Sequence, residues 1–292
     1  MVELIVADDG SKDNSAAIIE SMLSDAPIPM KFMRLDHGGI IKTLNKAFEV
    51  SKGDFIALLA SDDRFKRDKI SGHMQLMLAD RDIVLSHSDV QMIDKHGQVS
   101  SLDISSRGNP AQGHVGLDVL LGRSYIRYSP VMRRESLVQV GMFDEKYVLE
   151  DWPLYLKMAH LGKIGYVDKK LTERRVHGMN WSTLSARNPD TEFKGAALNL
   201  IEAFAPNKEI FRQAATVHMG SSLRGALYEG NIRGGLALAK VICRKFPEQR
   251  WIVFKIFLIG IASHLWGRYI KPHLSLRTQA VIVKWRDWVV AN

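Results

Sequence analysis

Pairs of acidic residues follow two apolar stretches near the start of the sequence. Asp8-Asp9 comes directly after the apolar residues 4–7, and Asp62-Asp63 comes shortly after the apolar residues 55–60. Carboxylate oxygens are hard ligands that suit Mg²⁺ or Mn²⁺, and such an ion can neutralise charge on a diphosphate leaving group. Asp62-Asp63 therefore indicates a divalent-metal site. A capped turn before the helix expected near Asp68 explains the same pair, because Asp is common in such turns.

A third acidic pair, Glu150-Asp151, stands immediately before Trp152-Pro153. A proline near the first turn marks the start of a helix, which we expect to continue to Leu161. A carboxylate here would suit a general base that takes a proton from an attacking hydroxyl. It would equally suit the positive end of the helix macrodipole, so the pair alone leaves both interpretations open.

Basic residues and a histidine follow in the segment Arg174-Arg175-Val176-His177. An arginine can contact a diphosphate with two parallel hydrogen bonds. A neutral histidine can complete the shell of a bound metal ion. The alternative is a solvated basic loop that contains an incidental histidine.

The apolar pattern predicts strands that alternate with helices around these residues, which indicates an α/β fold with a doubly wound, mostly parallel sheet. Such sheets bind ligands beyond the carboxyl ends of their strands, where Asp8-Asp9 and Asp62-Asp63 are expected. From about Asn188 the pattern becomes almost entirely helical, which predicts two regions, 1–187 and 188–292. The elements expected in the first half are strands at Met1–Ala7, Met30–Leu35, Asp54–Ala60, Ile83–Ser86 and Val90–Ile93, and helices at Ala16–Leu23, Ile40–Ser51 and 68–79.

Taken together and in order, these segments resemble the bacterial family 2 glycosyltransferases with the GT-A fold. The resemblance runs from about Val2 to Ser182. Its landmarks are Asp8-Asp9-Gly10-Ser11, Gly38-Gly39 with Lys42 and Asn45, Lys52-Gly53-Asp54, Ser61-Asp62-Asp63, Gly141-Met142-Phe143-Asp144-Glu145, Glu150-Asp151, and Arg175-Val176-His177 with Asn180 and Ser182.

The resemblance implies an inverting, metal-dependent transfer of a sugar from a nucleotide-sugar donor, usually a UDP-sugar. The acceptor would be a hydroxyl of a glycan or lipid-linked saccharide in surface polysaccharide assembly. The implied roles at the matching positions are nucleoside contact for Asp8 or Asp9, donor-cleft lining for Lys42 and Asn45, stabilisation of the diphosphate by Arg175, Mn²⁺ or Mg²⁺ ligation by Asp62, Asp63 and His177, and base catalysis by Asp151 beside Glu150.

Two features depart from the family pattern. The metal segment reads Ala60-Ser61-Asp62 where many members have two aspartates. The sequence also opens directly into the Asp8-Asp9 strand, whereas members usually carry a strand and helix before it. We therefore expect an open strand edge at Leu4–Ala7, weak binding of UDP and self-association. A catalytically inactive remnant that acts as a binding module is the alternative function.

Charge and cysteine content limit the other classes of function. The 292 residues carry a net charge of +8, with 25 basic and 25 acidic residues in 1–187 but 15 against 7 in 188–292. Because the α/β part is neutral and carries no nucleic-acid-binding motif, we expect no nucleic-acid partner. The single cysteine, Cys243, excludes a disulfide framework. With no signal peptide in the first residues, this predicts a cytoplasmic protein.

The end of the sequence combines tryptophans with basic residues, a composition typical of a membrane interface. Residues 251–292 carry six basic residues and one acidic residue. The apolar segment Trp251–Gly267 is short for a membrane span of about 30 Å. It fits a buried helix or, as we favour, an interfacial helix at the inner face of the plasma membrane.

Overall fold

The computed structural model describes residues 2–101, 108–147, 150–177, 191–228, 231–245, 247 and 250–265. The chain divides into two compact units, of which the first contains the residues up to His177 together with 195–214. The boundary predicted after residue 187 lies outside the described residues and stays a prediction. The α/β part nevertheless includes more helix than expected, because residues 195–214 group with it.

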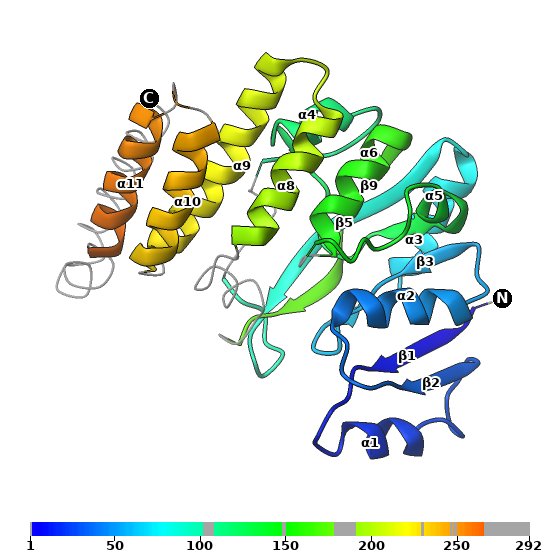
Figure 1. The fold of residues 1–292 in the computed structure, drawn as a ribbon. Coiled ribbons are helices and arrows are strands. Elements are labelled where there is room, and N and C mark those ends of the chain that lie inside the picture. The colour runs from blue at the N-terminus through cyan, green and yellow to red at the C-terminus, as the bar shows by residue number, and fades with distance from the viewer. Residues whose placement is uncertain are drawn as a thin grey trace. The chain divides into compact units, whose positions relative to one another are not determined.

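The chain begins with a β-α-β-α segment (Figure 1). Strand β1 (Leu4–Asp8) pairs in parallel with β2 (Met30–Arg34), and helix α1 (Ser15–Ser21) connects them. Helix α2 (Ile40–Val50) follows and contacts β1. These elements agree with the predicted ones to within a few residues.

A second sheet of five strands forms the centre of the first unit, in the order β3-β8-β5-β9-β4. Only β5 and β9 pair in parallel within it, whereas β3–β8, β5–β8 and β4–β9 are antiparallel. The sheet is therefore mixed, which corrects the expected mostly parallel arrangement, while the α/β class is confirmed. The strands are β3 (Phe55–Ala57), β4 (Arg64–Phe65), β5 (Ile83–Ile93), β8 (Val131–Arg133) and β9 (Lys163–Arg175).

Strand β5 is one continuous element of 11 residues where the sequence predicted two short strands. Its polar centre, Ser86–Ser88, is fully buried together with the flanking apolar residues. A polar stretch in a buried strand interrupts the apolar pattern without interrupting the strand, because the side chains find partners inside the protein.

Strand β1 has one edge without a partner strand among the described residues. Among the described residues, β1 pairs only with β2, and β3 pairs only with β8. Both strands are apolar in sequence but only partly buried, and Leu4 is 43% exposed. Unpaired edges of this kind are surfaces on which another strand can pair.

Helices pack around the five-stranded sheet and close the main hydrophobic core. Leu85 and Met132 on the sheet and Leu156 on α6 are fully buried in this core. The short strands β6 and β7 pair with each other beside it. These elements are α3 (Lys69–Ala79), β6 (Asn109–Pro110), α4 (Gly116–Leu120), β7 (Ser124–Tyr125), α5 (Arg134–Gln139) and α6 (Asp151–Leu161).

The remaining described residues form helices, as predicted. Leu227 packs closely against two glycines, since a Cβ atom at Gly235 or Gly260 would lie 2.7 Å from its side chain. Within the described ranges, no helix combines the length and the apolar character that a membrane crossing needs. The helices are α8 (Thr191–Phe204), α9 (Lys208–Tyr228), α10 (Ile232–Lys245) and α11 (Arg250–Leu265). Trp266, Trp285 and Trp288 lie outside the described residues.

Candidate active site

Asp9, predicted as one of two nucleoside contacts, holds the loop that leads into α2. Its carboxylate accepts hydrogen bonds from the N–H groups of Gly38 (2.8 Å) and Gly39 (3.1 Å) and from the Oγ1 hydroxyl of Thr43 (3.0 Å). Burial acts to raise the pKa of Asp9, but these donors prevail and lower the pKa. The carboxylate thus holds the loop before α2, including the N–H of the N-cap residue Gly39, to the first turn of the helix.

Asp8, the other candidate, is the buried last residue of β1. Its Oδ1 atom accepts hydrogen bonds from the N–H and the hydroxyl of Ser11. Its Oδ2 atom is buried and has no hydrogen-bond partner within the protein. Because a buried carboxylate oxygen without a donor costs free energy, Asp8 is better suited than Asp9 to receive an N–H or O–H group of a ligand.

Two predicted donor-cleft residues lie on α2. The side-chain amide of Asn45 donates to the carbonyl of Phe143 (2.8 Å) and accepts from its N–H (3.3 Å). Asn45 therefore connects α2 to the Gly141–Phe143 turn. Lys42 is exposed, and its side-chain carbons lie near Gly38.

Asp62 and His177, both predicted metal ligands, lie together. The Oδ2 atom of Asp62 is 3.1 Å from the Nε2 atom of His177. Adjacent ligands of an octahedral ion at about 2.1 Å lie about 3.0 Å apart, so the two atoms fit neighbouring positions around Mn²⁺ or Mg²⁺. Among the described residues, no group of three His, Cys, Asp or Glu residues fits a metal. Water and the oxygens of a ligand would have to complete the shell.

Asp63, the third predicted ligand, faces the protein interior. Its Oδ1 atom accepts the N–H of Arg175 at 2.8 Å, and it also accepts the hydroxyl of Tyr128. Burial raises its pKa against the effect of these donors. Asp63 therefore holds neighbouring segments in place and does not join Asp62 and His177 at the exposed pair.

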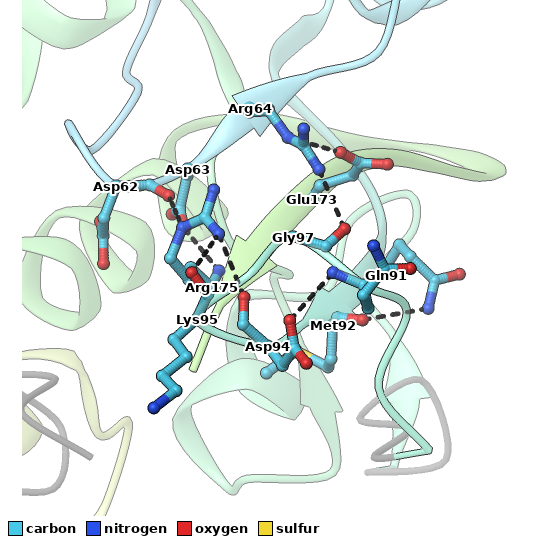
Figure 2. A network of polar contacts seen from close by, with 11 residues as sticks. Asp62, Asp63, Arg64, Gln91, Met92, Asp94, Lys95, Gly97, Glu173 and Arg175 are labelled. Atoms are coloured by element: carbon cyan, nitrogen blue, oxygen red, sulfur yellow. Dashed lines mark hydrogen bonds and ion pairs between the residues drawn. The ribbon is translucent and has the colours of Figure 1, made fainter. Parts of the chain in front are cut away.

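Arg175, predicted to contact the diphosphate, directs its guanidinium at backbone carbonyls (Figure 2). It donates to the carbonyl oxygens of Asp62 (2.8 Å), Asp94 (3.1 Å) and Lys95 (3.2 Å). Arg175 thus fixes the metal segment to the turn that follows β5. Nearby, Arg64 forms an ion pair with Glu173 at 2.9 Å.

The pair Glu150 and Asp151 lies where α6 begins, and its ionisation is unusual. Burial raises the pKa of both carboxyl groups, and the charge of Asp151 raises the pKa of Glu150 further. The N–H of Trp152 and the charge of Arg174 act against the rise at Asp151. A carboxylate of raised pKa is a better proton acceptor than an exposed one, as general-base catalysis requires.

Arg174 connects the metal segment with this acidic pair, a role that the sequence analysis did not assign. Its guanidinium lies 4.7 Å from the ring centre of Tyr128, and its charge counters the burial effect on the pKa values of Asp63 and Asp151. Arg174 and Arg175 are neighbours on β9, and successive side chains of a strand point to opposite faces. That alternation is the sequence signal that separates their roles.

Tyr155, also missed, lies one helical turn after Asp151 on α6. Burial raises its pKa well above the usual value, and the charges of Asp151 and Glu150 add to the rise. Its phenol therefore stays protonated beside the acidic pair. A single tyrosine in an apolar helix carries no sequence signal of this kind.

Part of the chain matches a known family and known proteins. Residues 1–133 match the family model Glycosyl transferase family 2. The chain is 24% identical over 193 residues to chondroitin synthase of Pasteurella multocida, a match that covers 66% of this chain and 19% of that protein. The chain spans less than a third of the length of the first curated relatives that it matches.

Solved structures confirm the expected GT-A fold. Residues 1–349 of Staphylococcus aureus TarS in complex with UDP-GlcNAc give a TM-score of 0.54 at 14% identity, covering 92% of this chain and 84% of that one. The mannosyltransferase PcManGT from Pyrobaculum calidifontis in complex with GDP-Man and Mn²⁺ gives 0.52 at 13% identity, covering 91% and 78%.

Proposed function

We propose that the chain transfers a sugar from a nucleotide-sugar donor to a hydroxyl acceptor with inversion, a proposal supported by the match of residues 1–133 to the family model Glycosyl transferase family 2. The observation that carries the proposal is the pairing of Asp62 with His177 at 3.1 Å, on segments 115 positions apart in sequence. The charge of Arg174 acts both on the pKa of Asp63, next to Asp62, and on the pKa of Asp151, which neighbours Glu150. These residues supply separate groups for the leaving diphosphate and for the attacking hydroxyl.

In the proposed reaction, Asp151 takes the proton of the acceptor hydroxyl as its oxygen attacks the anomeric carbon. The bond from that carbon to the diphosphate breaks on the opposite face, so no covalent sugar–enzyme intermediate forms. Mn²⁺ or Mg²⁺ held by Asp62 and His177 would neutralise the charge of the departing diphosphate. Arg174 adds a fixed positive charge that acts on both acidic segments.

For the donor, we propose a UDP-sugar with its nucleoside near the end of β1. The unpartnered Oδ2 atom of Asp8 supports this placement, because it can accept an N–H or O–H group of the nucleoside. Lys42, exposed on α2, supplies a positive charge near Gly38, in the loop held by Asp9. The UDP-GlcNAc complex of TarS supports the choice of a nucleotide sugar.

For the acceptor, we propose a glycan or lipid-linked saccharide used in surface polysaccharide assembly, reached at the inner face of the plasma membrane. The similarity to chondroitin synthase supports a glycan acceptor. On α11, Trp251, Phe254 and Leu258 are 68%, 49% and 51% exposed and share one helix face. Arg250 and Lys255, also exposed, supply charge that anionic lipids attract.

The direct test incubates the purified chain with a panel of nucleotide sugars, Mn²⁺ and saccharide acceptors, and measures release of the nucleoside diphosphate. Sugar transfer by the wild type that is lost in the variant Asp151→Asn supports the proposal. Binding of UDP by calorimetry without transfer of any donor would favour the alternative, a binding module. Sedimentation with vesicles containing anionic phospholipid, compared between the wild type and Trp251→Ala, tests the membrane surface separately.

A further inference from the structure

Tyr128 is a half-buried residue that connects parts of the candidate site from different segments. Its hydroxyl donates to the carboxylate of Asp63, the residue next to the predicted ligand Asp62. Asp63 in turn accepts the backbone N–H of Arg175, two residues before His177. Through one carboxylate, Tyr128 therefore acts on both segments that supply the Asp62–His177 pair.

The ring of Tyr128 makes a second, different contact. The guanidinium of Arg174 lies 4.7 Å from the ring centre, a cation–π arrangement. This contact orients the positive charge that acts on Asp151. The hydroxyl of Tyr128 thus contacts Asp63, and its ring contacts Arg174. Different substitutions of Tyr128 can remove one contact without the other.

The backbone that carries Tyr128 is held firmly. The next residue, Ser129, has a φ of 56°. Such an angle costs free energy in a residue other than glycine and persists only where the surrounding structure imposes it. The Ser129 hydroxyl donates to the carbonyl of Leu58 at 2.5 Å, just after β3, and the fully buried Lys69 donates its Nζ to the Ser129 carbonyl at 2.6 Å. These bonds fix Tyr128 relative to the strand that leads to Asp62.

We propose that Tyr128 is a positioning residue of the transfer site: its hydroxyl sets the geometry of the Asp62–His177 pair through Asp63, and its ring orients Arg174, whose charge acts on Asp151. The inference rests on the proposed function, which it deepens. It assigns no contact between Tyr128 and a substrate. Its effects must therefore appear in metal binding and in kcat, and not in the KM for the donor at saturating metal.

The test compares Tyr128→Phe, which removes only the hydroxyl, with Tyr128→Leu, which also removes the ring. The matched control is Tyr125→Phe, which removes the hydroxyl of a tyrosine that is 45% exposed on β7. Titration of each protein with MnCl₂ in the presence of UDP gives metal affinity without requiring turnover. Thermal unfolding shows whether each variant is folded.

Tyr128→Phe is expected to weaken Mn²⁺ binding about tenfold, as loss of a residue behind a metal site does, with the donor KM unchanged at saturating Mn²⁺. Tyr128→Leu is expected to lower kcat about threefold to tenfold further. Mn²⁺ affinity of Tyr128→Phe within twofold of both the wild type and Tyr125→Phe would overturn the proposal.

The two proposals fail in different ways. A wild-type protein that binds Mn²⁺ with UDP but transfers no sugar contradicts the proposed function, and the Mn²⁺ titration of Tyr128→Phe still decides the role of the hydroxyl. A wild-type protein that binds no Mn²⁺ contradicts the Asp62–His177 pair, and the inference about Tyr128 falls with it.

Discussion

The carboxylate of Asp62 lies 3.1 Å from the imidazole of His177, although 115 positions separate them in sequence. Asp62 follows β3, and His177 follows the end of β9 by two residues. Arg175 joins the two segments, because its side chain binds the carbonyl of Asp62 and its N–H binds Asp63. Hydrogen bonds between the two segments therefore position the pair.

Removal of the metal is expected to abolish transfer. EDTA should eliminate activity, and Mn²⁺ or Mg²⁺ should restore it, because the diphosphate then regains its counter-charge. Asp62→Ala and His177→Ala should each raise the Mn²⁺ concentration that gives half-maximal activity, while the exposed Asp25→Ala should not. Full activity of the wild type in chelator would exclude a metal role, and unchanged metal dependence of Asp62→Ala would exclude Asp62 as a ligand.

Asp151→Asn is expected to lower kcat by about 10²–10⁴ while UDP binding persists, since only the proton acceptor is lost. Calorimetry with UDP and Mn²⁺ and a coupled assay for nucleotide release measure the two effects. Glu145→Gln, which changes an exposed carboxylate on the preceding segment, serves as the control. Activity of Asp151→Asn within tenfold of the wild type would contradict the assignment.

The pH dependence of kcat should reflect the burial of this carboxylate. The base acts only when deprotonated, and burial raises the pKa of Asp151 from its ordinary value of 3.8. Activity should therefore fall on acidification at a higher pH than an exposed aspartate would give. Arg174→Gln removes a positive charge that lowers the pKa of Asp151, and it should move that fall to higher pH. A fall at the same pH in both proteins would show that Arg174 does not act on Asp151.

The sequence located the acidic pairs because each follows a strand or begins a helix, and those signals depend only on neighbouring residues. It could not locate Tyr128, since what matters there is contact with Asp63 and Arg174 from distant segments. The mixed sheet was missed for a related reason. Strand β8 is three residues long and β9 is largely polar, so neither shows the apolar pattern of a buried parallel strand.

Asn45 is a residue for which the sequence suggested a role in binding that its contacts do not show. Its position in a family motif suggested contact with the donor, but its amide is occupied by the backbone of Phe143. A motif records that a residue type is needed at a position. It does not distinguish contact with a ligand from support of the fold.

Stability should rise with pH because of Lys69. Burial lowers its pKa from 10.5 to about 7, so between these values the unfolded chain binds a proton that the folded chain has released. The free energy of unfolding should therefore increase as pH rises from 7 towards 10, by up to about 1.4 kcal/mol per pH unit. Urea denaturation at several pH values measures this. Lys69→Met should flatten the rise, and an identical slope in the variant would exclude Lys69 as its source.

The outer edge of β1 should promote self-association. Among the described residues β1 pairs only with β2, and Leu4 is 43% exposed beside that unpaired edge. Leu4→Lys places a charge there, which opposes edge-to-edge pairing. Light scattering after size exclusion should show larger species for the wild type than for Leu4→Lys at the same concentration. Ile18→Lys, which removes a 59% exposed apolar side chain on α1, should still associate. If Ile18→Lys becomes monomeric and Leu4→Lys does not, general surface hydrophobicity and not the strand edge drives the association.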